Sequence, residues 1–136
     1  MGKTTFSGPV AGAYVAFQTT VGAGTATKTM DGLIPTGMIF RMFAISVFQR
    51  TGGSCALIVG TTASTQGYLT TLNFAPDISS YKLLDGALVS EGGTIDLVGG
   101  TDEIICNFGG TLTDPTSITF HGYIVGHTSD LNADGV

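Results

Sequence analysis

The chain has 136 residues, of which 11% are charged, and a net charge of −5. This share of charge is about half of what is usual in soluble proteins, and the length suffices for one domain with a hydrophobic core. The five basic residues are scattered singly, which excludes the clustered Lys and Arg side chains of nucleic-acid binding. No apolar run reaches the roughly 20 residues that span a membrane, so we expect neither a nucleic-acid nor a membrane partner.

The first ten residues, MGKTTFSGPV, differ from the rest of the chain. They lack the cationic segment and the Leu-rich core of a signal peptide. We expect residues 1–10 to form an extended N-terminal arm that becomes ordered against a partner. A single domain over residues 11–128 and a flexible C-terminal tail over residues 129–136 complete the predicted organisation.

Short strand signals follow the arm in close succession, separated by Gly-rich turns. Residues 12–30 are rich in Thr, Ala and Gly and indicate one or two weak strands. Residues 38–49, MIFRMFAISVFQ, are apolar on both faces except for Arg41, which is typical of a strand buried centrally or against a neighbouring subunit. Shorter strands are predicted within 54–60, 67–71, 86–90 and 93–99, and a single helical turn within 77–84.

The last two strand signals alternate with period two. Residues 102–108 place Ile104, Cys106 and Phe108 on one face. Residues 117–125 place the apolar positions 118, 120, 122 and 124 on one face and His121 on the other, polar face. Many short strands without helical crossovers predict an all-β fold, namely a single-domain antiparallel β-sandwich or jelly-roll-like barrel.

The sequence contains no arrangement of residues that indicates catalysis. Residues 22–29 approach a phosphate-binding loop, but Thr27 occupies the second glycine position. His121 and His127 stand alone, and we expect both to be solvated. We therefore predict neither an enzyme nor a cofactor.

Two further features concern the thiols and the chain's last residues. Cys55 and Cys106 lie in apolar stretches and are interpreted as buried, reduced side chains. The alternative is a disulfide between them, which requires that their strands are neighbours. Asp130, Asn132 and Asp134 match the start of a calcium loop, but its closing Glu is missing. We expect a solvated tail and no resident metal, with calcium as a weak alternative.

Three stretches resemble a known family. KTTFSGPV (3–10) resembles the start of small virion proteins that tailed bacteriophages encode beside their major capsid protein. Residues 31–69, with a P-x-G lead, a long strand, L-x-V-G-T and G-Y-L, resemble head-decoration and fibre-head domains. Residues 99–126 resemble the paired final strands of the same jelly-roll-like domains.

The resemblance implies a capsid decoration, or cement, protein. Such a protein binds the major capsid protein on the outer surface of the capsid as a homotrimer and is assembled in the host bacterial cytoplasm. Lys3, Phe6 and Pro9 are then candidate contacts of the arm, with Phe6 as the apolar anchor and Lys3 facing an acidic patch. Arg41 is either a rim residue or part of an interchain salt bridge in the trimer.

The alternative is a trimeric receptor- or glycan-binding head domain of a phage fibre, since such jelly rolls also form trimers. A fibre head usually follows a long fibrous shaft, and the sequence shows none, which favours the decoration protein. A small β-sandwich enzyme is the least supported reading.

Overall fold

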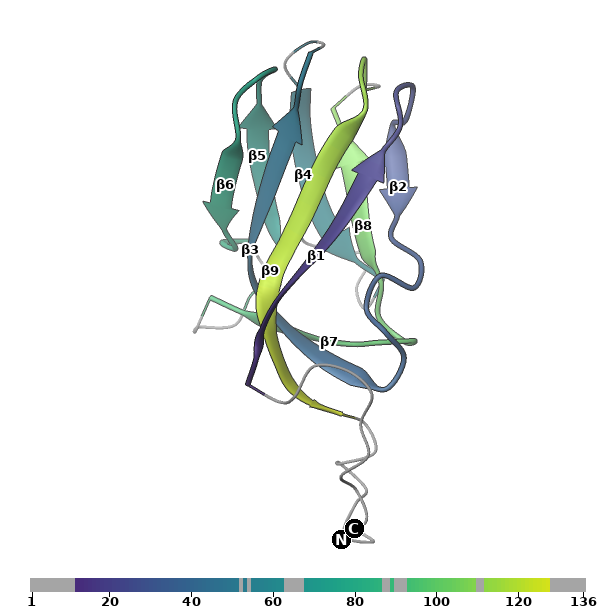
Figure 1. The fold of residues 1–136 in the computed structure, drawn as a ribbon, viewed down its shortest axis with the longest axis vertical. Helices are drawn as coiled ribbons and strands as arrows, with labels where there is room; N and C mark the ends of the chain where they lie inside the picture. The colour runs from purple at the N-terminus through teal and green to yellow at the C-terminus, as the bar shows by residue number, and fades with distance from the viewer. Residues whose placement is uncertain are drawn as a thin grey trace, which may run out of the picture.

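The computed structural model of the protein describes residues 12–51, 53, 55–62, 68–86, 89, 93–109 and 112–127. Within these ranges the regular secondary structure consists of β-strands alone. The strands form two antiparallel sheets that face each other (Figure 1). The all-β sandwich predicted from the sequence is confirmed. The described residues contain no helix long and apolar enough to cross a membrane.

The two sheets are called A and B. Sheet A has the order β1 (Tyr14–Val21), β9 (Thr116–His127), β3 (Met38–Gln49) and β6 (Ser80–Leu83), and β7 (Ile95–Val98) also pairs with β3. Sheet B has the order β2 (Thr27–Thr29), β8 (Ile104–Phe108), β4 (Cys55–Thr61) and β5 (Thr70–Phe74). In each sheet a strand from the C-terminal part of the chain thus lies between two strands from the N-terminal part: β9 between β1 and β3, and β8 between β2 and β4. This is the strand order of a jelly roll.

The core lies between the sheets and follows from the period-two pattern. In β9 the side chains of Ile118, Phe120 and Ile124 are fully buried, and the adjacent positions are partly exposed. In β8 the buried positions are Ile104, Cys106 and Phe108, as the alternation predicted. The core is therefore formed by the inner faces that the sequence pattern identified.

Gly122 occupies the inward position of β9 between Phe120 and Ile124, opposite Met42 of β3. A Cβ atom at this position would overlap the carbonyl oxygen of Arg41 and lie 2.6 Å from Cε1 of Phe40. Glycine is therefore required here because the backbone of β3 and the ring of Phe40 fill the space of a side chain.

β3 contains a β-bulge. Its register with β9 shifts between Met42 and Ala44, so that Phe43 is the extra residue of the bulge. Before the bulge, residues 39–42 of β3 pair with β7, and after it residues 44–47 pair with β6. The bulge is therefore the place where β3 changes its second neighbour, and Figure 1 shows that β3 is curved along its length.

Two expectations from the sequence are corrected or resolved. The helical turn predicted within 77–84 is wrong, because residues 80–83 form β6 and pair with residues 44–47 of β3. The two cysteines lie on neighbouring strands but do not pair, because Cys106 is opposite Val59 and Cys55 lies four residues before Val59 on β4. Both thiols are free; Cys106 is buried as predicted, whereas Cys55 is partly exposed.

Candidate binding surface

The outer face of sheet A carries a cluster of aromatic side chains. Tyr14 of β1 lies opposite Tyr123 of β9, and their side chains are 55% and 42% exposed. Tyr81 of β6 is 58% exposed. With Phe43 and His121 these residues form what we call the aromatic face: Tyr14, Phe43, Tyr81, His121 and Tyr123.

The bulge in β3 adds Phe43 to this face. Ile45 is buried opposite the inward Phe120, so Ala44 points outward, and the ring of Phe43 contacts Tyr14 and Tyr123 on the same side. Ala44 is fully buried although it is not part of the core between the sheets. The aromatic side chains therefore shield backbone and Ala44 on the outside of the sheet.

The rings contact one another across neighbouring strands. The centroids of Phe43 and Tyr123 are 5.4 Å apart, and those of Tyr14 and Tyr123 are 6.2 Å apart in an edge-to-face arrangement. Tyr81 lies 5.6 Å from the ring of His121. Such contacts fix the rings before any partner arrives, which lowers the entropy lost on binding.

His121 lies at the centre of this cluster. Its Nδ1 is 2.5 Å from Oη of Tyr14, and its Nε2 is 2.8 Å from Oγ of Ser46. Burial lowers the pKa of His121 below the ordinary value of 6.5. The residue that we expected to be solvated is thus a hydrogen-bonded, neutral part of the aromatic face at neutral pH.

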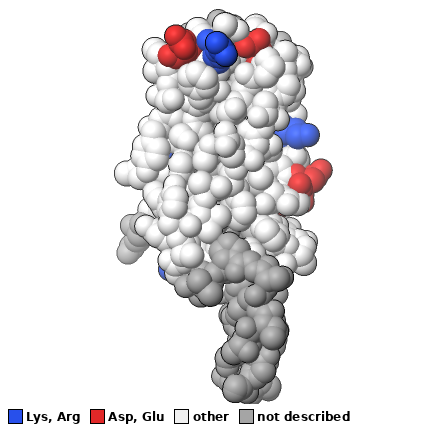
Figure 2. Space-filling view, in the orientation of Figure 1, with Lys and Arg blue, Asp and Glu red and all other residues white. Residues whose placement is uncertain are grey.

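The face carries almost no charge. Among the outward positions of β1, β9, β3 and β6 in the described residues, only Arg41 has a charged side chain. Figure 2 shows charged side chains at the upper end and the right edge of the molecule, whereas the middle of this face has none. A partner can therefore cover the middle without desolvating a charge.

Arg41 is paired within its own chain. Its Nε and Nη2 donate to Oδ1 and Oδ2 of Asp96 on β7, at 2.7 and 3.0 Å. The side chains of both residues are nearly half exposed, at 46% and 45%. The hydrogen bonds with Asp96, more than its charge, raise the pKa of Arg41. An interchain salt bridge of Arg41 stays a prediction, and it would have to share or replace Asp96.

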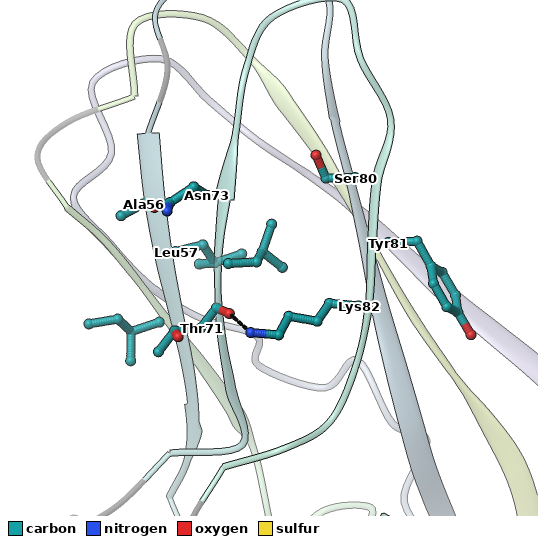
Figure 3. Close-up of a pocket in the computed structure, with 9 residues that line it drawn as sticks. Ala56, Leu57, Thr71, Asn73, Ser80, Tyr81 and Lys82 are labelled. Carbon is teal, nitrogen blue, oxygen red and sulfur yellow. Dashed lines mark hydrogen bonds between the residues drawn. The ribbon is translucent and has the colours of Figure 1, made fainter.

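A separate cavity of about 550 Å³ lies where β5 and β6, the edge strands of the two sheets, come together (Figure 3). Lys82 reaches across it, and its Nζ donates to the carbonyl oxygen of Thr71 at 2.5 Å and lies 3.3 Å from Oδ2 of Asp85. A hydrogen bond from Thr70, with a smaller contribution from Lys82, lowers the pKa of Asp85. Lys82, the only cation among the described residues that line this cavity, is thus already paired, and its side chain shields the edge of β5.

The structure brings together none of the other predicted site residues. Lys3, Phe6 and Pro9, and likewise Asp130, Asn132 and Asp134, lie outside the described residues. Within the described part of the chain, no three His, Cys, Asp or Glu side chains are placed to hold a metal ion.

The sequence reasoning missed the aromatic face itself. Alternation in residues 117–125 had placed Tyr123 and His121 on one face, but Tyr14, Phe43 and Tyr81 join them only through strand order. The available signal was the apolar outer face of residues 38–49.

The comparisons with known proteins give no family. Neither protein-family models nor curated proteins match the chain. Among solved structures, it is similar to a subunit of Bacillus endospore appendages, which form disulfide-linked pili; the two chains are 13% identical with a TM-score of 0.39, over 89% of this chain and 99% of the other. It is also similar to the virus-like particle of the extra small virus of the giant freshwater prawn Macrobrachium rosenbergii, with 8% identity and a TM-score of 0.42, over 90% and 85%. Likeness this distant does not determine what the chain does.

Proposed function

We propose that this protein is a structural component of a bacteriophage virion, a decoration or cement protein that binds the outer surface of the capsid as a homotrimer. The single observation that carries the proposal is the exposed, nearly uncharged aromatic face of sheet A. The resemblance of the sequence to head-decoration domains supports the same role. The partner is the major capsid protein, and assembly takes place in the host bacterial cytoplasm.

The aromatic face contacts the capsid in this proposal. Five of the eight large apolar side chains that are exposed in the described residues lie on the outer face of sheet A: Tyr14, Phe48, Tyr81, Leu83 and Tyr123. Exposed apolar groups of this kind mark interaction sites, and tyrosine is enriched among residues that dominate binding energy. Contact with a complementary, uncharged capsid surface would bury these five side chains, and removing their apolar surface from water would stabilise the complex.

Stabilisation of the capsid then results from linked equilibria and not from chemistry. A protein that binds only the expanded shell lowers the free energy of that state by mass action. A trimer that contacts several capsid subunits at once gains further from its multivalency.

Cosedimentation with expanded phage heads tests the proposal. Tyr123→Ser is compared with Tyr68→Ser, because Tyr68 is equally exposed, at 41% against 42%, but lies outside the aromatic face. We expect Tyr123→Ser to weaken binding about tenfold or more, as for a tyrosine central to an interface, and Tyr68→Ser to leave binding unchanged. Equal binding by both variants would contradict a role of the face, and failure of the unaltered protein to bind heads would contradict the function.

A receptor- or glycan-binding fibre head is the second candidate. The exposed tyrosines lie beside outward hydroxyl groups of Ser46, Ser117 and Thr119, and this mixture of rings and hydroxyls also suits uncharged sugars. Binding of the isolated protein to a glycan array, lost in Tyr123→Ser and retained in Tyr68→Ser, would support this candidate.

A further inference from the structure

The outer edge of β1 is an open strand edge of unusual composition. Within the described residues β1 pairs only with β9, so its other edge has no ladder partner there. The strand is eight residues long, YVAFQTTV, and contains no charge, proline or glycine. β1 therefore lacks the charged side chains and the proline that usually protect an edge from strand addition. By contrast β6, at the other edge of sheet A, has four residues and carries Lys82.

The backbone groups at this edge can be assigned from the ladder. The N–H of Ile124 donates to the carbonyl of Ala13, so the backbone of Ala13 points toward β9. Backbone direction alternates along a strand. The N–H and C=O groups of Tyr14, Ala16, Gln18 and Thr20 therefore point to the open edge.

We propose that residues 1–8 of a second copy of this chain add to the edge of β1 as an antiparallel strand. The inference rests on the proposed homotrimer and names the contact that holds it together. In a ring of three copies, each copy gives its arm to one neighbour and receives the arm of the other. Such a head-to-tail contact forms a closed ring when the rotations between the three neighbouring copies add up to a full turn.

Length and charge support this occupant. Residues 1–8 match the eight residues of β1, and Pro9 ends the match because it has no N–H for the ladder. Lys3 is the only charged side chain in residues 1–11, whereas the rest of the chain carries four basic and ten acidic side chains. A positively charged arm is thus attracted to a negatively charged body.

The arm of the same copy fits this edge less well. The N–H of Gly12 already donates to the carbonyl of Ile124, so the chain runs beside β9 from Gly12 onward. An arm that folded back onto its own β1 would have to reverse within residues 9–11. An arm from a neighbour has no such constraint.

The test is the molar mass in solution, measured by light scattering during size-exclusion chromatography. Gln18→Pro removes an N–H that points to the open edge and spares the hydrogen bonds to β9, while Gln18→Ser keeps that N–H and is the matched control. Deletion of residues 2–8 leaves all described residues intact. It removes the proposed contact from the other side and replaces Gln18→Pro in the test if that variant does not fold. We expect the mass of a trimer for the full chain and Gln18→Ser, and one third of that mass for Gln18→Pro and the deletion.

A peptide titration distinguishes the arm from other contacts. A fluorescent peptide of residues 1–9 should bind the deleted protein, with its anisotropy rising, and should not bind the deleted protein that carries Gln18→Pro. A trimer that survives the deletion would overturn the inference. A full chain that is monomeric would also overturn it, and would indicate that the arm binds its own β1 or the capsid instead. Cosedimentation with heads reports separately on the proposed function, because Tyr123→Ser and the deletion act on different surfaces.

Discussion

A methyl group added at Gly122 has no space in the sandwich. The new Cβ atom would overlap the carbonyl oxygen of Arg41 and lie 2.6 Å from Cε1 of Phe40, where about 3.4–4 Å is an ordinary contact. The ring of Phe40 and the backbone of β3 must therefore both move, by about 1 Å. Because one of the two obstacles is backbone, rotation of a side chain cannot relieve the overlap.

We expect Gly122→Ala to lower the free energy of unfolding by about 3 kcal/mol, at the upper end of the cost of overpacking a core. This corresponds to a fall of roughly 10 °C in Tm. Gly126→Ala is the matched control, because Gly126 lies on the same strand and its new Cβ would be 3.9 Å from Cδ1 of Ile39. The control should be neutral or gain about 0.4–1 kcal/mol from the stiffer unfolded chain.

Urea unfolding of both variants, followed by circular dichroism, measures the difference directly. A difference of less than about 0.5 kcal/mol, within the usual effect of surface substitutions, would refute the close approach of β9 to β3. The fold would then have to place the two strands further apart than the ladder allows.

Three further predictions concern single side chains. Because the pKa of His121 is lower in the folded state, the unfolded state binds more protons below about pH 6.5. The free energy of unfolding should therefore fall as the pH drops through about 6.5 and level off below the folded-state pKa. His121→Asn should flatten this dependence in urea titrations between about pH 7.5 and 5.5. Burial raises the pKa of Cys106 to about 12, so a thiol reagent at pH 8 should label Cys55 quickly and Cys106 only on unfolding, and two fast thiols would contradict the burial. Arg41→Ala should change thermal unfolding little, because Arg41 and Asp96 are nearly half exposed; a large loss would show that the pair is buried in an assembly.

Local pattern predicted individual strands well and their arrangement poorly. The alternation in residues 102–108 and 117–125 identified their buried positions, because each strand has one face in the core. Residues 80–83 were misassigned because Tyr81 and Leu83 are both exposed, so burial gives no apolar-in, polar-out pattern to read.

The aromatic face could be predicted only in part. The apolar outer face of residues 38–49 indicated a contact beyond the sheet, but its composition depends on the bulge at Phe43, which no local rule locates. The sequence pattern of residues 116–127 does not indicate that this strand lies between β1 and β3. The arm contacts Lys3, Phe6 and Pro9 stay predictions.

The central place of β9 in sheet A has a consequence for synthesis. Among the described residues β1 pairs only with β9, whereas β3 also pairs with β6 and β7, so β1 joins sheet A only after residues 116–127 have been synthesised. Pairing strands so distant in sequence is slow, because a long loop must close first. In the meantime the uncharged strand β1 and the edge of β3 that faces β9 are open to other nascent chains. Folding of the protein in the cell thus depends on how quickly β9 becomes available to β1 and β3.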